Sequence, residues 1–176
     1  FIICAGYKQH VIKEYFADYF LHTSDVTFDF TNGRNDMTIH RNTSERWKVT
    51  VVDTGLNTMT GGRVKRVKDY IGDEPFMLTY GDGVSDLNIT ELVKFHQSHG
   101  KMVTISAYNA GQRFGVLDID ENGSIKEFRE KTQGDGNMIN IGFMVCKSEF
   151  IDYIEGDFTV LERAPLETVA KLNQLM

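Results

Sequence analysis

The first part of the chain moves from an apolar run to a helical pattern and then to a period of two. Phe1–Ala5 is continuously apolar, and apolar residues then recur over Val11–Phe20 at the spacing of one helix face. Residues 26–31 alternate between apolar and polar, and the Asn32-Gly33 pair leads into a second alternating run. These patterns predict a strand, a helix and a hairpin-like insertion over about 26–47.

Strands and helices continue to alternate through the middle of the chain. The predicted strands are Trp47–Asp53, Phe76–Tyr80 and 103–107. Thr60-Gly61-Gly62 opens a helix between the first two strands. Asn88 and Glu91 form a capping-box pattern at the start of another helix, and Gly100 is a typical residue for its end.

The last third of the chain predicts a hairpin, an apolar strand and two helices. Residues 113–120 and 124–130 flank the turn signal Glu121-Asn122-Gly123. Further elements are predicted as a strand over Met138–Val145 and helices over 148–155 and, after Pro165, 166–175. The whole predicts a single α/β domain over 1–176, with a Rossmann-like mixed, mainly parallel sheet covered by helices and a β-hairpin insertion.

Composition narrows the class of protein. The 176 residues carry 19 basic and 25 acidic side chains, a net charge of −6, which disfavours nucleic acid and anionic membranes as partners. Two cysteines cannot form a disulfide framework. No apolar stretch approaches the roughly 18 residues of a membrane span. We therefore expect a cytoplasmic globular protein.

Gly81-Asp82-Gly83 is the first candidate site. It follows a predicted strand, and ligands of open α/β sheets bind beyond the carboxyl ends of the strands. Flanking glycines leave room for a ligand, and Mg²⁺ prefers a carboxylate oxygen alongside waters and substrate phosphates. The alternative is a tight turn in which Asp82 bonds its own backbone.

The segment from Thr58 to Arg63 is the second candidate. Its paired glycines at a helix entrance suggest exposed backbone N–H groups that favour anions, and Arg63 offers a planar fork of donors. Lys65, Arg66 and Lys68 are interpreted as a solvated basic face.

Glu130-Lys131 and Asn140 form the third candidate. A Glu can accept two sugar hydroxyls, a Lys can hold a phosphate, and an Asn within an apolar strand needs partners. The alternatives are a surface ion pair and a structurally bonded amide.

Taken together, the ordered phrases resemble the sugar-nucleotide pyrophosphorylase superfamily, and within it the glucose-1-phosphate cytidylyltransferases. The phrases are Asp53-Thr54-Gly55, Thr60-Gly61-Gly62-Arg63, Tyr80-Gly81-Asp82-Gly83, Arg113-Phe114-Gly115, Glu130-Lys131, Gly134-Asp135-Gly136 with Met138-Ile139-Asn140, and Glu162-Arg163 before Pro165-Leu166. The resemblance covers essentially the whole chain.

The resemblance implies an Mg²⁺-dependent enzyme that joins CTP to α-D-glucose 1-phosphate, giving CDP-glucose and pyrophosphate for the synthesis of surface-polysaccharide deoxysugars. By motif, Asp82 resembles the Mg²⁺ ligand, while Thr58, Arg63 and Gly81 match nucleotide contacts. The positions that match the sugar-phosphate side are Tyr80, Gly115, Glu130, Lys131 and Asn140, with Lys131 holding the phosphate. The insertion over 26–47 resembles an arm that contacts neighbouring subunits, which implies a homo-oligomer.

The chain departs from the pattern at both ends. The glycine-rich G-x-G-T-R loop with its nearby Lys is absent, and so is the segment that carries the second metal-binding Asp. We therefore expect a fragment of a longer enzyme, inactive or poorly active by itself. The alternatives are a uridylyl- or thymidylyltransferase with the same fold, or a non-catalytic sugar-nucleotide-binding homologue.

Overall fold

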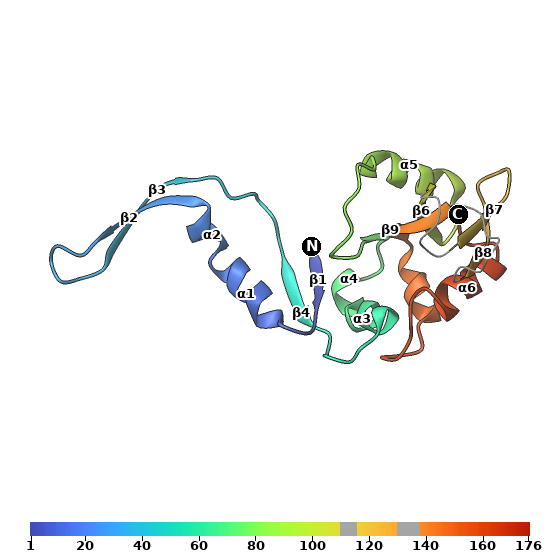
Figure 1. Ribbon diagram of the computed structural model, residues 1–176, viewed down its shortest axis with the longest axis horizontal. Coiled ribbons are helices and arrows are strands. Elements are labelled where there is room, and N and C mark those ends of the chain that lie inside the picture. The colour runs from blue at the N-terminus through green and yellow to red at the C-terminus, as the bar shows by residue number, and fades with distance from the viewer. Residues whose placement is uncertain (110–115, 130–137) are drawn as a thin grey trace. The chain divides into compact units, whose positions relative to one another are not determined.

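The computed structural model describes residues 1–109, 116–129 and 138–176 of the protein (Figure 1). Contacts divide the chain into two compact units, Phe1–Leu56 and Asn57–Met176. The single domain over 1–176 stays a prediction.

The first unit contains the strand, helix and hairpin that the hydrophobic pattern predicts. The elements are β1 (Ile2–Ala5), α1 (Gln9–Ala17), α2 (Tyr19–His22), β2 (Ser24–Asp29), β3 (Asp36–Asn42) and β4 (Thr50–Asp53). Strand β1 pairs in parallel with β4, and β2 pairs with β3 in an antiparallel hairpin whose turn contains Gly33 at a φ of 68°. The predicted strand from Trp47 begins only at Thr50, and the Trp47 ring stacks on Tyr19 with ring centroids 5.7 Å apart.

The second unit is built on a five-stranded sheet. Its strands are β5 (Phe76–Leu78), β6 (Val103–Asn109), β7 (Val116–Ile119), β8 (Ile125–Arg129) and β9 (Met138–Cys146). Strand β9 pairs with β5, β6 and β7, and β7 pairs with β8, all antiparallel.

The mixed α/β class is confirmed, but parallel pairing does not dominate among the described strands. The named strands that pair in parallel are β1 and β4. Strands β5 and β6 run in the same direction, as their connection through a helix predicts, but β9 lies between them and opposes both. A strand–helix–strand pattern sets the direction of two strands and not their adjacency, so the sequence could not reveal the inserted β9.

The helices of the second unit are α3 (Thr60–Arg66), α4 (Lys68–Ile71), α5 (Ile89–His99), the 3₁₀ helix η1 (Ser148–Tyr153) and α6 (Ala164–Lys171). The predicted caps of α5 are confirmed. Asn88 Oδ1 accepts the Glu91 N–H at 3.2 Å, and Gly100 ends the helix at a φ of 67°. No helix among the described residues is long and apolar enough to cross a membrane.

The predicted helix over 166–175 ends earlier than expected, at Lys171. The chain turns at Asn173, and Met176 donates its N–H to the Val103 carbonyl at 3.0 Å beside β6. Leu175 is thereby fully buried, which explains why the end of the chain leaves the helix.

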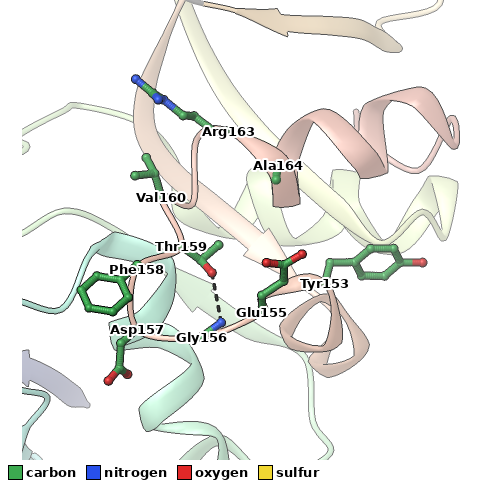
Figure 2. A pocket seen from close by; sticks show the side chains of 9 residues that line it. All are labelled: Tyr153, Glu155, Gly156, Asp157, Phe158, Thr159, Val160, Arg163 and Ala164. Atoms are coloured by element: carbon green, nitrogen blue, oxygen red, sulfur yellow. Dashed lines mark hydrogen bonds between the residues drawn. The ribbon is translucent and has the colours of Figure 1, made fainter.

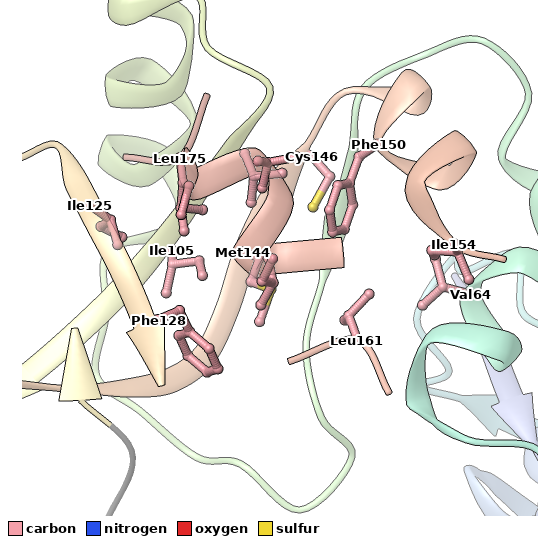
Figure 3. Packing of buried hydrophobic residues seen from close by; sticks show 14 of the residues in the cluster. Val64, Ile105, Ile125, Phe128, Met144, Cys146, Phe150, Ile154, Leu161 and Leu175 are labelled. Carbon is pink, nitrogen blue, oxygen red and sulfur yellow. The ribbon is translucent and has the colours of Figure 1, made fainter. Parts of the chain in front are cut away.

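The core of the second unit lies between the sheet and the segment after β9 (Figure 3). Met144 and Cys146 of β9 are buried against Phe150, Ile154 and Leu161. Val64 of α3 belongs to the same cluster, so burial of apolar area fixes α3 against the segment that follows η1.

Candidate active site

The Gly81-Asp82-Gly83 segment forms an exposed turn directly after β5. The Gly83 N–H donates to the Tyr80 carbonyl at 3.3 Å, and all three residues of the segment are exposed. A Cβ atom added to Gly81 would meet no atom within 4 Å. Within the described residues the Asp82 carboxylate has no hydrogen-bond partner, in contrast to the alternative in which it bonds its own turn.

An exposed lone carboxylate with open space beside it fits one kind of metal site. The described residues contain no group of three or more His, Cys, Asp or Glu side chains that could hold a metal ion. Mg²⁺ is commonly held by one or two carboxylates while waters and substrate phosphates supply the other ligands. Asp82 therefore fits a Mg²⁺ ion that arrives with a phosphorylated substrate.

Tyr80, at the start of this turn, is tightly held. Its hydroxyl donates to the Glu162 carboxylate and accepts a hydrogen bond from the Asn140 side chain. Burial, followed by the adjacent Glu162 carboxylate, raises the pKa of the Tyr80 hydroxyl well above its ordinary value. Tyr80 is therefore a neutral phenol that donates a proton to Glu162.

A bulge in β9 brings Asn140 to Tyr80. The register between β6 and β9 shifts between Ile105 and Ala107, and Gly142 stands in the bulged stretch at a φ of 82°. Asn140 Oδ1 accepts the Gly142 N–H at 2.8 Å. A Cβ atom on Gly142 would lie 2.4 Å from the Tyr80 ring, so glycine is required there. The Asn140 amide, which is half-buried, thus has hydrogen-bond partners within the protein.

The glycine pair at the start of α3 is packed, and the prediction of exposed N–H groups there is wrong. Gly61 and Gly62 both donate their N–H groups to the Thr159 carbonyl, at 2.9 and 3.3 Å. A Cβ atom on Gly61 would lie 2.8 Å from that oxygen, and one on Gly62 would lie 2.5 Å from the Asp157 carbonyl oxygen. The two glycines allow the backbone of α3 to pack closely against the backbone of Asp157 and Thr159. Their N–H groups are therefore not available to a ligand.

The neighbouring predicted nucleotide contacts lie on either side of this pair. Thr58 is buried, and Arg63 is half-buried in the first turns of α3. Thr60 donates its hydroxyl to Glu162 at 2.8 Å and accepts the Leu161 N–H at 2.9 Å. The structure therefore connects Thr60, Glu162, Tyr80 and Asn140 through hydrogen bonds.

The basic side chains of this region are exposed, as expected for a solvated face, but they are also paired. Arg66 binds Asp157 through two hydrogen bonds of 2.8 and 2.6 Å, and Lys68 pairs with Asp152 at 2.6 Å. Lys65 donates to the backbone carbonyl of Glu155 at 3.0 Å. These contacts fasten α3 and α4 to the segment that follows β9.

The segment after η1 also lines an open cavity of about 480 Å³ (Figure 2). Its lining residues run from Tyr153 to Ala164 and include the exposed Phe158 and Arg163. None of the predicted site residues in the described part of the chain lines this cavity.

Three predicted site residues, Gly115, Glu130 and Lys131, lie outside the described residues. Sequence reasoning did not assign a role to Glu162, although the Glu162-Arg163 phrase was part of the resemblance. The spacing of residues in the sequence could not predict the contacts of Glu162, because its hydrogen-bond partners lie 82 and 102 residues away.

Residues 3–176 match the model of the nucleotidyl transferase family. The chain is 52% identical to a glucose-1-phosphate cytidylyltransferase of Salmonella typhi, over all of this chain and 68% of that protein. It is 42% identical to a probable glucose-1-phosphate cytidylyltransferase of Bacillus subtilis, over 99% of this chain and 67% of that protein. The chain thus spans about two thirds of the length of these relatives.

Solved structures support the same fold. HddC from Yersinia pseudotuberculosis superposes with a TM-score of 0.66 at 19% identity, over 92% of this chain and 62% of that one. An apo UDP-glucose pyrophosphorylase gives a TM-score of 0.62 at 16% identity, over 72% of this chain and 54% of that one. At these identities the likeness concerns the fold, whereas the sequence relatives match along the whole chain. The chain belongs to the nucleotidyl transferase family, and within it to the glucose-1-phosphate cytidylyltransferases.

Proposed function

We propose that the protein transfers a cytidylyl group from CTP to α-D-glucose 1-phosphate, producing CDP-glucose and pyrophosphate with the help of Mg²⁺. The observation that carries this proposal is the 52% identity to a glucose-1-phosphate cytidylyltransferase along the entire chain. The exposed Asp82 turn after β5 supports it, because such a turn can receive a metal-bound phosphate.

The reaction is a displacement at phosphorus. A phosphate oxygen of the sugar phosphate attacks the α-phosphorus of CTP, a new P–O bond forms, and the bond to the bridging oxygen of pyrophosphate breaks. The nucleophile belongs to the substrate, so the protein's task is to position two polyanions and to offset their charge. No protein nucleophile is required.

Asp82 would hold the metal ion through its exposed carboxylate. When bound, Mg²⁺ supplies charge neutralisation at the phosphoryl oxygens. Gly81 leaves the approach to Asp82 open, since no atom lies within 4 Å of the position of its missing Cβ. Asp82 and Gly81 together offer one carboxylate and the space for a phosphate.

The remaining site residues divide between the two substrates. We assign Thr58 and Arg63 to the nucleotide, with the Arg63 guanidinium reading the cytosine carbonyl. Tyr80 and Asn140 belong to the sugar-phosphate side, together with the residues outside the described part of the chain: Gly115, Glu130 and Lys131.

The hairpin of the first unit supports a further proposal, a homo-oligomer assembled through the insertion. Phe28 pairs across the hairpin with Met37, and Val26 pairs with Ile39, so apolar side chains share one face. Phe28, Met37 and Ile39 are exposed large hydrophobic residues. A second copy of the chain would cover this surface.

We place the product in deoxysugar synthesis for a surface polysaccharide, in the cytoplasm.

Pyrophosphate release by the full-length protein tests the function. The protein is incubated with Mg²⁺ and each pairing of CTP, UTP, dTTP or GTP with glucose 1-phosphate or mannose 1-phosphate. We expect the highest kcat/KM with CTP and glucose 1-phosphate, and loss of activity with a chelator. Preference for UTP or dTTP would instead identify a uridylyl- or thymidylyltransferase. Absence of release with every pair would identify a non-catalytic homologue.

A further inference from the structure

The Glu162 carboxylate is a junction between two parts of the candidate site. One oxygen accepts the hydroxyl of Tyr80, and the other accepts the hydroxyl of Thr60 at 2.8 Å. Glu162 is half-buried, and both partners belong to elements distant in sequence. Hydrogen bonds to an ionised acceptor are roughly twice as strong as those between neutral groups.

The Tyr80 side of this junction leads to Asp82. Tyr80 opens the turn that the Gly83 N–H closes at 3.3 Å, and Asp82 lies inside that turn. The Tyr80 ring packs on the backbone of Gly142 and its hydroxyl also contacts Asn140. The first residue of an otherwise exposed turn is therefore fixed from three directions.

The Thr60 side leads to α3. Thr60 is the first residue of that helix, and it also accepts the Leu161 N–H at 2.9 Å. Arg63, the proposed cytosine reader, lies in the same helix. Both hydroxyls thus approach one carboxylate, each from a segment with a proposed substrate contact.

We propose that Glu162 is a positioning residue for nucleotidyl transfer, which holds the Asp82 turn and the start of α3 in one geometry by accepting the hydroxyls of Tyr80 and Thr60 together. This inference rests on the proposed function, because it concerns the geometry of that reaction. It does not require Glu162 to touch a substrate.

The chemistry of the junction explains why a carboxylate is needed. A carboxylate only accepts hydrogen bonds, so both hydroxyls can donate to it at once. A glutamine in its place would present one oxygen and one NH₂ group, and one hydroxyl would lose its acceptor. Glu162→Gln therefore preserves the shape of the side chain while removing the acceptor for one of the two hydroxyl protons.

Kinetics of three full-length variants test the proposal: Glu162→Gln, Tyr80→Phe and the double variant. We expect each single variant to lower kcat by about 10- to 100-fold, the order that small misplacement of reacting groups costs, with the KM for CTP within about threefold of wild type. We expect the kcat of the double variant to lie within about threefold of the kcat of the slower single variant, because the two residues act through one contact.

Binding of Mn²⁺ supplies a readout besides activity. Free Mn²⁺ is measured by electron paramagnetic resonance in the presence of CTP, and we expect Glu162→Gln to bind Mn²⁺ at least about threefold more weakly than wild type, because Asp82 is less well placed. Exposed side chains of the same types provide matched controls, Tyr70→Phe and Glu74→Gln, which should leave kcat and Mn²⁺ binding unchanged. If Glu162→Gln does not fold, Tyr80→Phe, which removes a single oxygen atom, carries the test.

The outcomes separate this inference from the proposed function. If wild type makes CDP-glucose and Asp82→Ala does not, while Glu162→Gln and Tyr80→Phe match their controls, the positioning role is overturned and the proposed function stands. Multiplied losses in the double variant also overturn the shared contact. If wild type makes no CDP-glucose, both proposals fail.

Discussion

The glycine pair of α3 and the glycines that flank Asp82 resemble one another in the sequence and differ in the structure. Gly61 and Gly62 are buried against the backbone of Asp157 and Thr159, and their N–H groups are used there. Gly81 is exposed and has no atom near the position of its missing Cβ. The first segment uses glycine to bring two backbones together, whereas the second uses it to keep a surface open.

The difference teaches that glycine beside a helix or strand end does not by itself identify a ligand loop. What decides is whether another part of the chain already occupies the space and accepts the N–H groups. For α3 the acceptor is Thr159, nearly a hundred residues away in sequence. For Gly81 of the Asp82 turn, no described atom lies within 4 Å of the position of the missing Cβ, so a substrate can approach there.

The largest expected effect is a loss of stability caused by a substitution in the packed glycine pair of α3. Gly62→Ala should lower the free energy of unfolding by about 3 kcal/mol, because its Cβ would lie 2.5 Å from the Asp157 carbonyl oxygen, a backbone atom that cannot rotate away. The gain of about 1 kcal/mol in helix propensity is too small to offset this clash. Urea denaturation measures the change.

Gly81→Ala is the matched control for that experiment. Its unfolding free energy should stay within about 0.5 kcal/mol of wild type, since the new methyl group meets no atom within 4 Å. Equal destabilisation by the two substitutions would contradict the contrast between a packed and an open segment.

The next effect concerns the open turn. Asp82→Ala should lower kcat at least about 100-fold, the order for one electrostatic group in the transition state, while thermal unfolding stays at the wild-type temperature. Asp86→Ala removes an exposed carboxylate nearby and should retain activity. A fully active Asp82→Ala protein would remove the metal assignment.

A smaller effect is expected from Arg63→Ala, which tests whether α3 also contacts the nucleotide. Arg63→Ala should reduce the preference for CTP over UTP by about tenfold, the order of one hydrogen bond to a charged group, and slow the reaction with CTP less than that. The ratio of kcat/KM values for the two nucleotides measures it. An unchanged ratio would confine α3 to a structural role.

The smallest effect tests the ion pair that fastens α3. The Arg66 guanidinium, through its hydrogen bonds, lowers the pKa of the Asp157 carboxyl, so the folded protein binds this proton less readily than the unfolded chain. Its stabilisation is present above the ordinary Asp pKa and is lost as the pH falls through the lower, folded value. Asp157→Asn should therefore be slightly less stable than wild type at pH 7 and equally stable once the wild-type carboxyl is protonated. A stability difference that does not change with pH would contradict this origin.

The sequence predicts elements whose signals are local. The Asn88 cap, the Gly100 helix end and the turn at Gly33 were all confirmed, because each depends on neighbours within a few residues. The candidate Asp82 turn was also found by a local rule, since it follows a strand. Its role as a metal ligand stays a prediction.

Features set by distant partners could not be predicted. The glycine pair was misjudged because Thr159 was not visible from its position, and Glu162 received no role because its partners, Thr60 and Tyr80, lie far upstream. The predicted helix at the end of the chain extended too far because Leu175 is buried in the sheet region. Each error concerns a contact that only the folded chain creates.

The most direct test of the account is the position of a metal ion in crystals of the full-length protein grown with CTP and Mn²⁺. Anomalous scattering locates Mn²⁺ without assumptions about the ligands. We predict one Mn²⁺ coordinated by an Asp82 carboxylate oxygen at about 2.1 Å, together with a phosphate oxygen of CTP. A Mn²⁺–CTP complex bound elsewhere, with the Asp82 carboxylate free of metal and phosphate, would contradict the account.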